Sequence, residues 1–313
     1  MAITADRILK GVKRRAVLPT NQNLLDDDDM LEIIDDNIKA HVIPLIDSVN
    51  GEFFVTSTNT AIVASQDNYA IPYRSIGRAI RDLKIIDTDT GNVRNSPYIE
   101  PEDVHLFADT ALNFGHYFKG DEIYLIPSVP STFAAPESLQ IWYKLRPSAL
   151  TKLTNAAKVT SVSSPTVEVA SVGNVATGSV VDFIAGKSGN SILNIDKTCT
   201  NVSGTTLTFA AADIPSGLAV GDYISLAGTS PVITMIPDEV MPFLERISAA
   251  ECLATIGDEI GASNLSQGVS IERKNLLSLL QPRNEGEPKI IINRNSLARG
   301  SKFKQRRYLY GGS

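Results

Sequence analysis

Residues that could do chemistry are few and scattered in this chain. The triplet Gly186-Lys187-Ser188 supplies the lysine and the hydroxyl of a phosphate-binding loop. Such a loop also needs a glycine five residues before Gly186, where Val181 stands, and a helix after the serine, where residues 189–191 predict a turn. We therefore interpret Lys187 as a lysine on a β-turn.

The histidines and cysteines indicate neither a nucleophile with its base nor a metal site. His41, His105 and His116 belong to no recognisable serine or cysteine motif, and Cys199 and Cys252 match no disulfide, zinc or redox spacing. We expect surface or structural histidines and buried or half-buried thiols. The expectation is a protein that is not an enzyme, without catalytic residues, cofactor or metal. Because carboxylates are plentiful, a general acid/base pair of them stays an open alternative.

One dense group of acidic residues consists of Asp26, Asp27, Asp28 and Asp29. They open a segment, 24–49, in which apolar residues recur every three or four positions and predict an amphipathic helix. Carboxylates at a helix start complement its dipole, whereas adjacent helical residues point in different directions and do not converge on a cation. The run therefore predicts a helix entrance. Pro44 predicts a kink or break near His41.

The C-terminal segment has the opposite charge to the rest of the chain. Residues 283–313 hold eight basic and two acidic residues, a net charge of +6, so residues 1–282 carry −12 of the total of −6. The candidate partner-binding residues here are Lys289, Arg294, Arg299, Lys302, Phe303, Lys304, Arg306, Arg307, Tyr308 and Tyr310. These residues favour an extended arm that pairs with an acidic partner surface. Direct nucleic-acid contact and a solvated end remain alternatives. Nucleic-acid contact is disfavoured because the acidic body of the chain repels DNA.

The elements that must position these residues change character along the chain. A helix is predicted at about 4–15, and from residue 52 to 150 the hydrophobic period shortens towards two. In that β-rich middle we predict strands at Phe53–Thr56, Thr60–Ala64, Glu122–Ile126 and Leu139–Leu145, a short helix at Ser75–Leu83 and a hairpin tip at Asp89–Asn92.

Residues 158–230 form a distinct region with only eight charged side chains in 73 positions. Short β-branched runs alternate there with glycine turns, which predicts an inserted small all-β barrel or sandwich. After it, an apolar stripe predicts a helix over 238–260 ended by Gly261, and a second helix over 268–281 stopped by Pro282.

The fold class predicted is therefore α+β, with a helical core built from N- and C-terminal helices. The domains expected are 1–155, with N-terminal helices and the β-rich middle; 156–231, the inserted all-β domain; 232–282, the C-terminal helices; and 283–313, the basic arm. With 43% hydrophobic residues the chain can bury a core. Since neither a signal peptide nor 18 consecutive apolar residues occur, we expect a soluble protein made in a cytoplasm.

Several segments of the sequence resemble a known protein family. Residues 221–231, 236–244, 246–261, 276–282 and 286–297 resemble the C-terminal half of head-to-tail adaptor (connector) proteins of tailed bacteriophages. The opening Ala5–Leu9, followed by an acidic helix, is similar to that family in order and character. The resemblance covers about half of the chain and includes no catalytic signature.

The resemblance implies a virion protein of the neck, made in the bacterial host cytoplasm. It implies a ring of about twelve copies docked beneath the portal protein, joining capsid to tail, with double-stranded DNA passing through the lumen without sequence-specific binding. Neighbouring copies and other neck or tail proteins are then the further partners, with no membrane. Asp26 to Asp29 are expected to face the channel, and the arm to reach the portal or a neighbour.

Two alternatives stay open. One is another virion protein, such as a stopper, tail-completion or decoration protein, which should lack the long amphipathic helix of 238–260. The other is a soluble enzyme with a carboxylate site in the β-rich middle, which a tight pocket holding two close carboxylates would favour.

Overall fold

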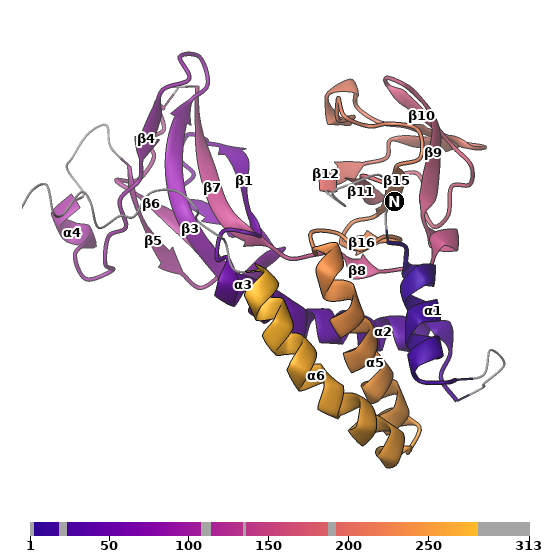
Figure 1. Cartoon of the computed structure of the whole chain (residues 1–313). Coiled ribbons are helices and arrows are strands. Elements are labelled where there is room, and N and C mark those ends of the chain that lie inside the picture. The colour runs from indigo at the N-terminus through magenta and orange to yellow at the C-terminus, as the bar shows by residue number, and fades with distance from the viewer. Residues whose placement is uncertain (1–2, 19–23, 108–113, 134–135, 187–191, 281–313) are drawn as a thin grey trace, which may run out of the picture. The chain divides into compact units, whose positions relative to one another are not determined.

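A computed structural model describes residues 3–18, 24–107, 114–133, 136–186 and 192–280 of the chain. Helices lie at both ends of this part and strands lie between them (Figure 1). The helices are α1 (Ala5–Arg15), α2 (Asp27–Asn37), a π-helix (Ile38–Val42), α3 (Ile43–Val49), the short α4 (Val104–Phe107), α5 (Met241–Thr255) and α6 (Glu259–Leu280).

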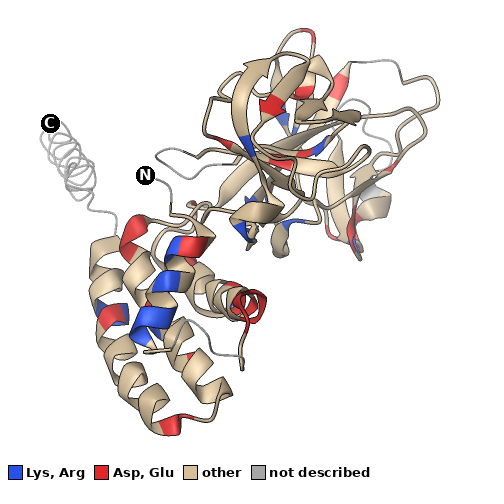
Figure 2. Cartoon of the chain, turned by 90° about the vertical axis from the view of Figure 1, so that its right-hand side faces the viewer, with Lys and Arg blue, Asp and Glu red and all other residues tan. Residues whose placement is uncertain are grey.

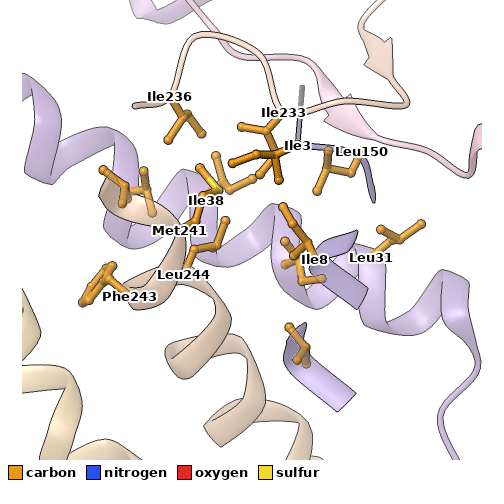
Figure 3. Packing of buried hydrophobic residues seen from close by; sticks show 14 of the residues in the cluster. Ile3, Ile8, Leu31, Ile38, Leu150, Ile233, Ile236, Met241, Phe243 and Leu244 are labelled. Carbon is orange, nitrogen blue, oxygen red and sulfur yellow. The ribbon is translucent and has the colours of Figure 1, made fainter. Parts of the chain in front are cut away.

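The helices from the two ends of the chain share one hydrophobic core, as predicted. Both α1 and α2 pack against α5, and α6 packs along α5. Ile8, Ile34 and Leu244 are fully buried in this core, and Figure 3 shows Ile8, Leu31 and Leu244 among its neighbouring side chains. The expected α+β class with terminal helices packed together is confirmed.

The expected disturbance near His41 is present as a π-helix between α2 and α3. Pro44 has no N–H to give to the preceding turn, and its ring crowds the carbonyl of residue 40. The wider π turn over Ile38–Val42 accommodates both effects without ending the helical path. Its last residue, Val42, remains buried in the core.

The β-rich middle contains two antiparallel sheets. One has the strand order β1-β7-β3-β4 and the other β2-β6-β5. The strands are β1 (Val55–Ala61), β2 (Asn68–Ala70), β3 (Ser75–Asp87), β4 (Val93–Asn95), β5 (Gly115–Lys119), β6 (Glu122–Ile126) and β7 (Glu137–Leu145). Leu83 and Ile141 are register partners and bury their side chains in one core. The predicted strands over 122–126 and 139–145 and the hairpin tip between β3 and β4 are confirmed.

The helix predicted over Ser75–Leu83 is wrong, because these residues begin β3. Ile76, Ile80 and Leu83 have helical spacing, yet β3 pairs with β7. The register shifts between Ser75 and Ile80, and again before Asp82, and Gly77 and Arg78 have positive φ. This irregularity breaks the two-residue alternation that identifies a strand. Residues 53–64 likewise hold one strand, β1, and not the two predicted.

The low-charge region forms a seven-stranded antiparallel sheet of order β12-β11-β15-β9-β10-β14-β13. Its strands are β9 (Ala157–Ser163), β10 (Thr166–Val169), β11 (Val180–Ile184), β12 (Ile192–Thr198), β13 (Asn201–Ser203), β14 (Thr206–Thr208) and β15 (Tyr223–Leu226). Val159, Phe183 and Leu207 are buried in its own core. Before and after this sheet, β8 (Ala149–Leu150) pairs in parallel with β16 (Thr229–Ser230).

Gly261 does not end the predicted helix of 238–260. A 3₁₀ turn over Asp238–Val240 leads into α5, which ends at Thr255. Gly257 follows with φ +86°, the left-handed conformation that glycine adopts without strain. Gly261 lies in the first turn of α6, where its N–H donates to Asp258 Oδ1 at 2.9 Å. The apolar period continues through Ile256 and Ile260 and conceals this break.

The described residues up to Leu280 cluster as one compact unit. The boundaries at 155/156 and 231/232 therefore stay predictions. The predicted arm lies outside the described residues, as do its candidate partner-binding positions Lys289, Arg294, Arg299, Lys302, Phe303, Lys304, Arg306, Arg307, Tyr308 and Tyr310. Within the described part of the chain, no helix is long and apolar enough to cross a membrane.

Candidate interaction surfaces

The four aspartates begin α2, as the sequence predicts. Asp26 is the N-cap: its Oδ1 accepts hydrogen bonds from the backbone N–H groups of Asp28 and Asp29, both at 2.8 Å. Asp29 Oδ2 accepts in return from the N–H of Asp26 at 3.1 Å, completing a capping box. The bond from the Asp29 N–H is the main reason why the pKa of Asp26 lies below its usual value. This part of the run therefore starts the helix.

The two middle aspartates tie α2 to other segments. Asp27 pairs with Lys13 of α1 at 2.5 Å, and Asp28 pairs with Lys152, just after β8, at 2.7 Å. All four carboxylates are thus used in capping or ion pairs within the chain. The interpretation as a helix entrance is confirmed, whereas their facing a channel remains a prediction.

A basic surface on α1 was not singled out from the sequence. Of the five basic residues in this helix, Lys13 pairs with Asp27, and Arg15 pairs with Glu245 of α5 at 2.9 Å. The other three, Arg7, Lys10 and Arg14, are exposed and have no ion-pair partner among the described residues. We call these three residues the basic stripe of α1. The ribbon of α1 is accordingly blue at its Lys and Arg positions in Figure 2.

The basic stripe borders a cleft of about 570 Å³. Its lining residues are Thr4, Asp6, Arg7, Lys10, Gly11, Arg14 and Glu245. Gly11 faces the carboxylate of Glu245 of α5, which a Cβ at this position would displace. In the sequence, these three cations recur every three or four residues, which places them on one face of the predicted helix, away from the apolar Ile8 and Val12. Each of the three exposed cations can pair with a single negatively charged group of a partner, whereas the cleft itself also presents Asp6 and Glu245.

A buried ion pair connects the β-rich middle with the seven-stranded sheet. Arg74, which precedes β3, donates from Nη1 to Asp182 Oδ2 of β11 at 2.6 Å and from Nη2 to Ser148 Oγ at 2.9 Å. Asp182 also accepts from the N–H of Gly228 at 3.0 Å and of Asp196 at 3.1 Å. Both partners are buried. Because the charges are paired and hydrogen-bonded, this cluster fixes one strand of the sheet to the loop before β3.

A second buried carboxylate belongs to Asp35 of α2. Both of its oxygens accept from the N–H of Leu150 in β8, at 2.8 and 3.0 Å. Burial raises the pKa of Asp35 to about 7, although the bond from Leu150 opposes the shift. Through its bonds to Leu150, Asp35 connects the helical core to the segment that leads into the seven-stranded sheet.

The histidines and cysteines occupy structural or surface positions, as expected. His116 is buried with Nδ1 3.0 Å from Ser96 Oγ, and burial lowers its pKa to about 4. His41 and His105 are exposed. Cys199 and Cys252 are free and buried, and burial raises the pKa of the Cys252 thiol to about 11.

Neither the glycine–lysine–serine triplet nor a metal cluster gains support. The N–H of Gly186 donates to Asp222 Oδ1 at 2.9 Å, so Gly186 is a close-packed position beside the turn before β15. Lys187 and Ser188 lie outside the described residues. Among the residues whose positions are described, no three His, Cys, Asp or Glu side chains gather in a way that could hold a metal ion.

Comparison with known proteins adds no relationship: no protein-family model matches the chain, and no curated protein matches it.

Proposed function

We propose that this chain is a structural virion protein, a head-to-tail adaptor of the neck of a tailed bacteriophage. It forms a ring of about twelve copies beneath the portal, joins capsid to tail and continues the DNA channel during packaging and ejection. Its partners are the portal protein, neighbouring copies and other neck or tail proteins. Double-stranded DNA passes through the lumen without sequence-specific binding.

The observation that carries the proposal is the closure of one helical core from both ends of the chain. The first described residues bond to the segment that enters α5: the N–H of Ala5 donates to the carbonyl of Pro231, and the N–H of Ile233 to that of Ile3, both at 2.9 Å. All β elements lie between α3 and α5. The sequence resembles the adaptor family in its opening and in its C-terminal half, and these two parts supply the helices that close the core.

The two alternatives are less well supported. A stopper, tail-completion or decoration protein was expected to lack the long amphipathic helix of 238–260; α5 occupies Met241–Thr255 of that range and packs against α1 and α2. An enzyme was expected to hold two close carboxylates in the β-rich middle. A cleft of about 270 Å³ against β3 and β7 is lined by Arg81, Asp82, Lys84 and Trp142, a single carboxylate with two cations.

Three finer assignments belong to the proposal. Residues 156–231 are an inserted all-β domain that faces solvent or other neck and tail proteins; the separate core of the seven-stranded sheet supports its being a separate module. Residues 283–313 are an extended basic arm that orders on a portal or neighbouring subunit. The entrance of α2 contributes negative charge to the channel wall, where it repels the phosphate backbone.

The test is imaging of the full chain alone and mixed with portal-bearing particles, together with its mass in solution. A ring beneath the portal is the expected result, even from a free protein that is monomeric. Absence of a ring and of binding in both conditions would overturn the proposal and direct attention to the β-rich middle as a ligand site.

A further inference from the structure

The basic stripe of α1 has a counterpart of opposite charge on α2. Arg7, Lys10 and Arg14 are three and four residues apart, so they lie on one face of α1 over about 10 Å. None has an ion-pair partner among the described residues, although the chain as a whole is acidic. Three unpaired cations on one exposed helix face leave local charge that a partner can neutralise.

The exposed face of α2 carries acids with the same spacing. Beyond the capping box, Glu32 and Asp36 continue the line of Asp29 at steps of three and four residues. Glu32 has no ion-pair partner in the described part of the chain, and Asp36 pairs only with exposed Lys39 at 3.2 Å. We call Glu32 and Asp36 the acidic stripe of α2. The opposite face of α2, with Met30 and Ile34, is buried in the core.

We propose that the basic stripe of α1 in one copy docks on the acidic stripe of α2 in a second copy of this chain. The occupant follows from charge complementarity, since the equal spacing lets two cations meet two carboxylates along one helix face. A contact between two different surfaces repeats from copy to copy and closes as a ring when the rotation permits. The inference rests on the proposed function, for which it names the subunit contact.

Duplex DNA is the competing occupant of the basic stripe. The cleft argues against it, because Asp6 and Glu245 line it beside the three cations and Glu245 is already paired with Arg15. A phosphate backbone would therefore meet mixed charge there, whereas the carboxylates of a neighbour can reach single cations. DNA binding is kept as an outcome of the test.

The test reverses each stripe in the full chain. Lys10→Glu with Arg14→Glu reverses the two cations that have the same four-residue spacing as Glu32 and Asp36, and Glu32→Lys with Asp36→Lys makes the α2 face basic. Asp29 is left in place because it belongs to the capping box. Arg273→Glu with Lys274→Glu on exposed positions of α6 is the control, with the same charge change as the α1 variant. Circular dichroism and thermal unfolding verify that each variant is folded.

Each reversed variant alone should associate about a hundredfold more weakly than the wild-type chain, measured by sedimentation at low salt and by ring occupancy on portal-bearing particles. An equimolar mixture of the two variants should associate again, because each then offers the face that the other has lost. The α6 control should behave like the wild type. Restoration in the mixture supports the contact even if one variant alone is poorly folded.

Wild-type association that neither variant weakens, or a mixture that fails to associate, would overturn the inference. Loss of duplex DNA binding in the α1 variant, without any effect of the α2 variant on assembly, would assign the basic stripe to phosphate instead. Rings of both variants on the portal would reject the contact and leave the adaptor function standing. Salt-sensitive association rescued by mixing, without portal binding, would support the contact and reject the adaptor function.

Discussion

Buried charged residues carry the strongest constraints at the scale of single residues. Arg74 and Asp182 are both buried and satisfy each other, with Ser148 and Gly228 completing their hydrogen bonds. Removing one member of such a pair strands the other charge in a medium that solvates it poorly. Neither residue stands out in the sequence, where both resemble ordinary surface charges.

Asp182→Asn should lower the free energy of unfolding by about 3–5 kcal/mol, because Arg74 is left buried without its counter-charge. Urea unfolding of the full chain measures this. Replacing both residues, with Arg74→Met and Asp182→Leu, should cost less than the sum of the two single changes. Lys39→Met, which removes an exposed ion pair, is the control and should stay within about 1 kcal/mol. An Asp182→Asn chain as stable as this control would contradict the assignment.

The pKa of Asp35, raised to about 7 in the folded chain from an ordinary 3.8, makes stability depend on pH. Between these values the folded state holds a proton that the unfolded state has released. The free energy of unfolding therefore falls as pH rises, by up to about 1.4 kcal/mol per pH unit, and levels off above about pH 7. Asp35→Asn removes this dependence.

The difference in unfolding free energy between the wild type and Asp35→Asn isolates this group, because all others titrate in both chains. Urea unfolding at several pH values between about 5 and 8 should show the variant gaining relative stability as pH rises. A difference that does not change with pH would show that Asp35 titrates normally.

At the scale of elements, local signals and packing disagree in identifiable places. The N-cap at Asp26 and the disturbance before Pro44 follow from local chemistry, and both are present. β3 was mistaken for a helix because its irregular pairing with β7 leaves apolar residues at helical spacing. The end of α5 was misplaced because Gly257, and not Gly261, takes the left-handed conformation.

Two elements decide how residues 156–231 can be removed. Excising the whole stretch deletes β16, which pairs with β8, and Asp182, the partner of Arg74. Excising only 154–227 with a short flexible linker keeps β8 and β16. We expect the helical core of this shorter chain to unfold cooperatively when Arg74→Met is added, and to be less stable when Arg74 remains.

Differential scanning calorimetry of the two excised chains checks this expectation. The excised chain with Arg74→Met should have a higher melting temperature than the excised chain that keeps Arg74. In the latter, Arg74 has lost Asp182 and its charge is unpaired. If neither chain gives a cooperative transition, the seven-stranded sheet is part of the core and not a separable module.

For the whole molecule, the asymmetry of charge is the feature to explain. Residues 283–313 carry +6 against −12 in the rest of the chain. A basic segment attached to an acidic body suits a role that is performed in an assembly, because its charge and aromatic residues are then neutralised and buried by a partner. The stripes of α1 and α2 add a second division of charge within the helical core.

Truncation of Lys289–Ser313 should leave the body folded and abolish attachment to portal-bearing particles. The described residues of the helical core all precede this segment: Leu276 of α6 is buried in the core, and α6 is described to Leu280. Thermal unfolding should therefore be close to that of the full chain, while co-sedimentation with the particles is lost. Attachment that persists after truncation would remove this role from the arm.

The sequence by itself determined the features that depend on local periodicity and composition. These are the terminal helices, the N-cap of α2, the strands β6 and β7, and the change to a low-charge β region, because each is specified by residues close in the chain. Among the candidate site residues, Asp26 to Asp29 could be interpreted from local sequence alone, as the start of a helix.

Only the tertiary structure decided which distant residues meet. The pairing of Arg74 with Asp182 spans 108 positions and that of Arg15 with Glu245 spans 230, so no local pattern announces either. The basic stripe emerged for the same reason: all five cations of α1 look alike in sequence until Asp27 and Glu245 neutralise two of them. Burial and pairing are properties of the packed chain, and they determine which charges remain available to a partner.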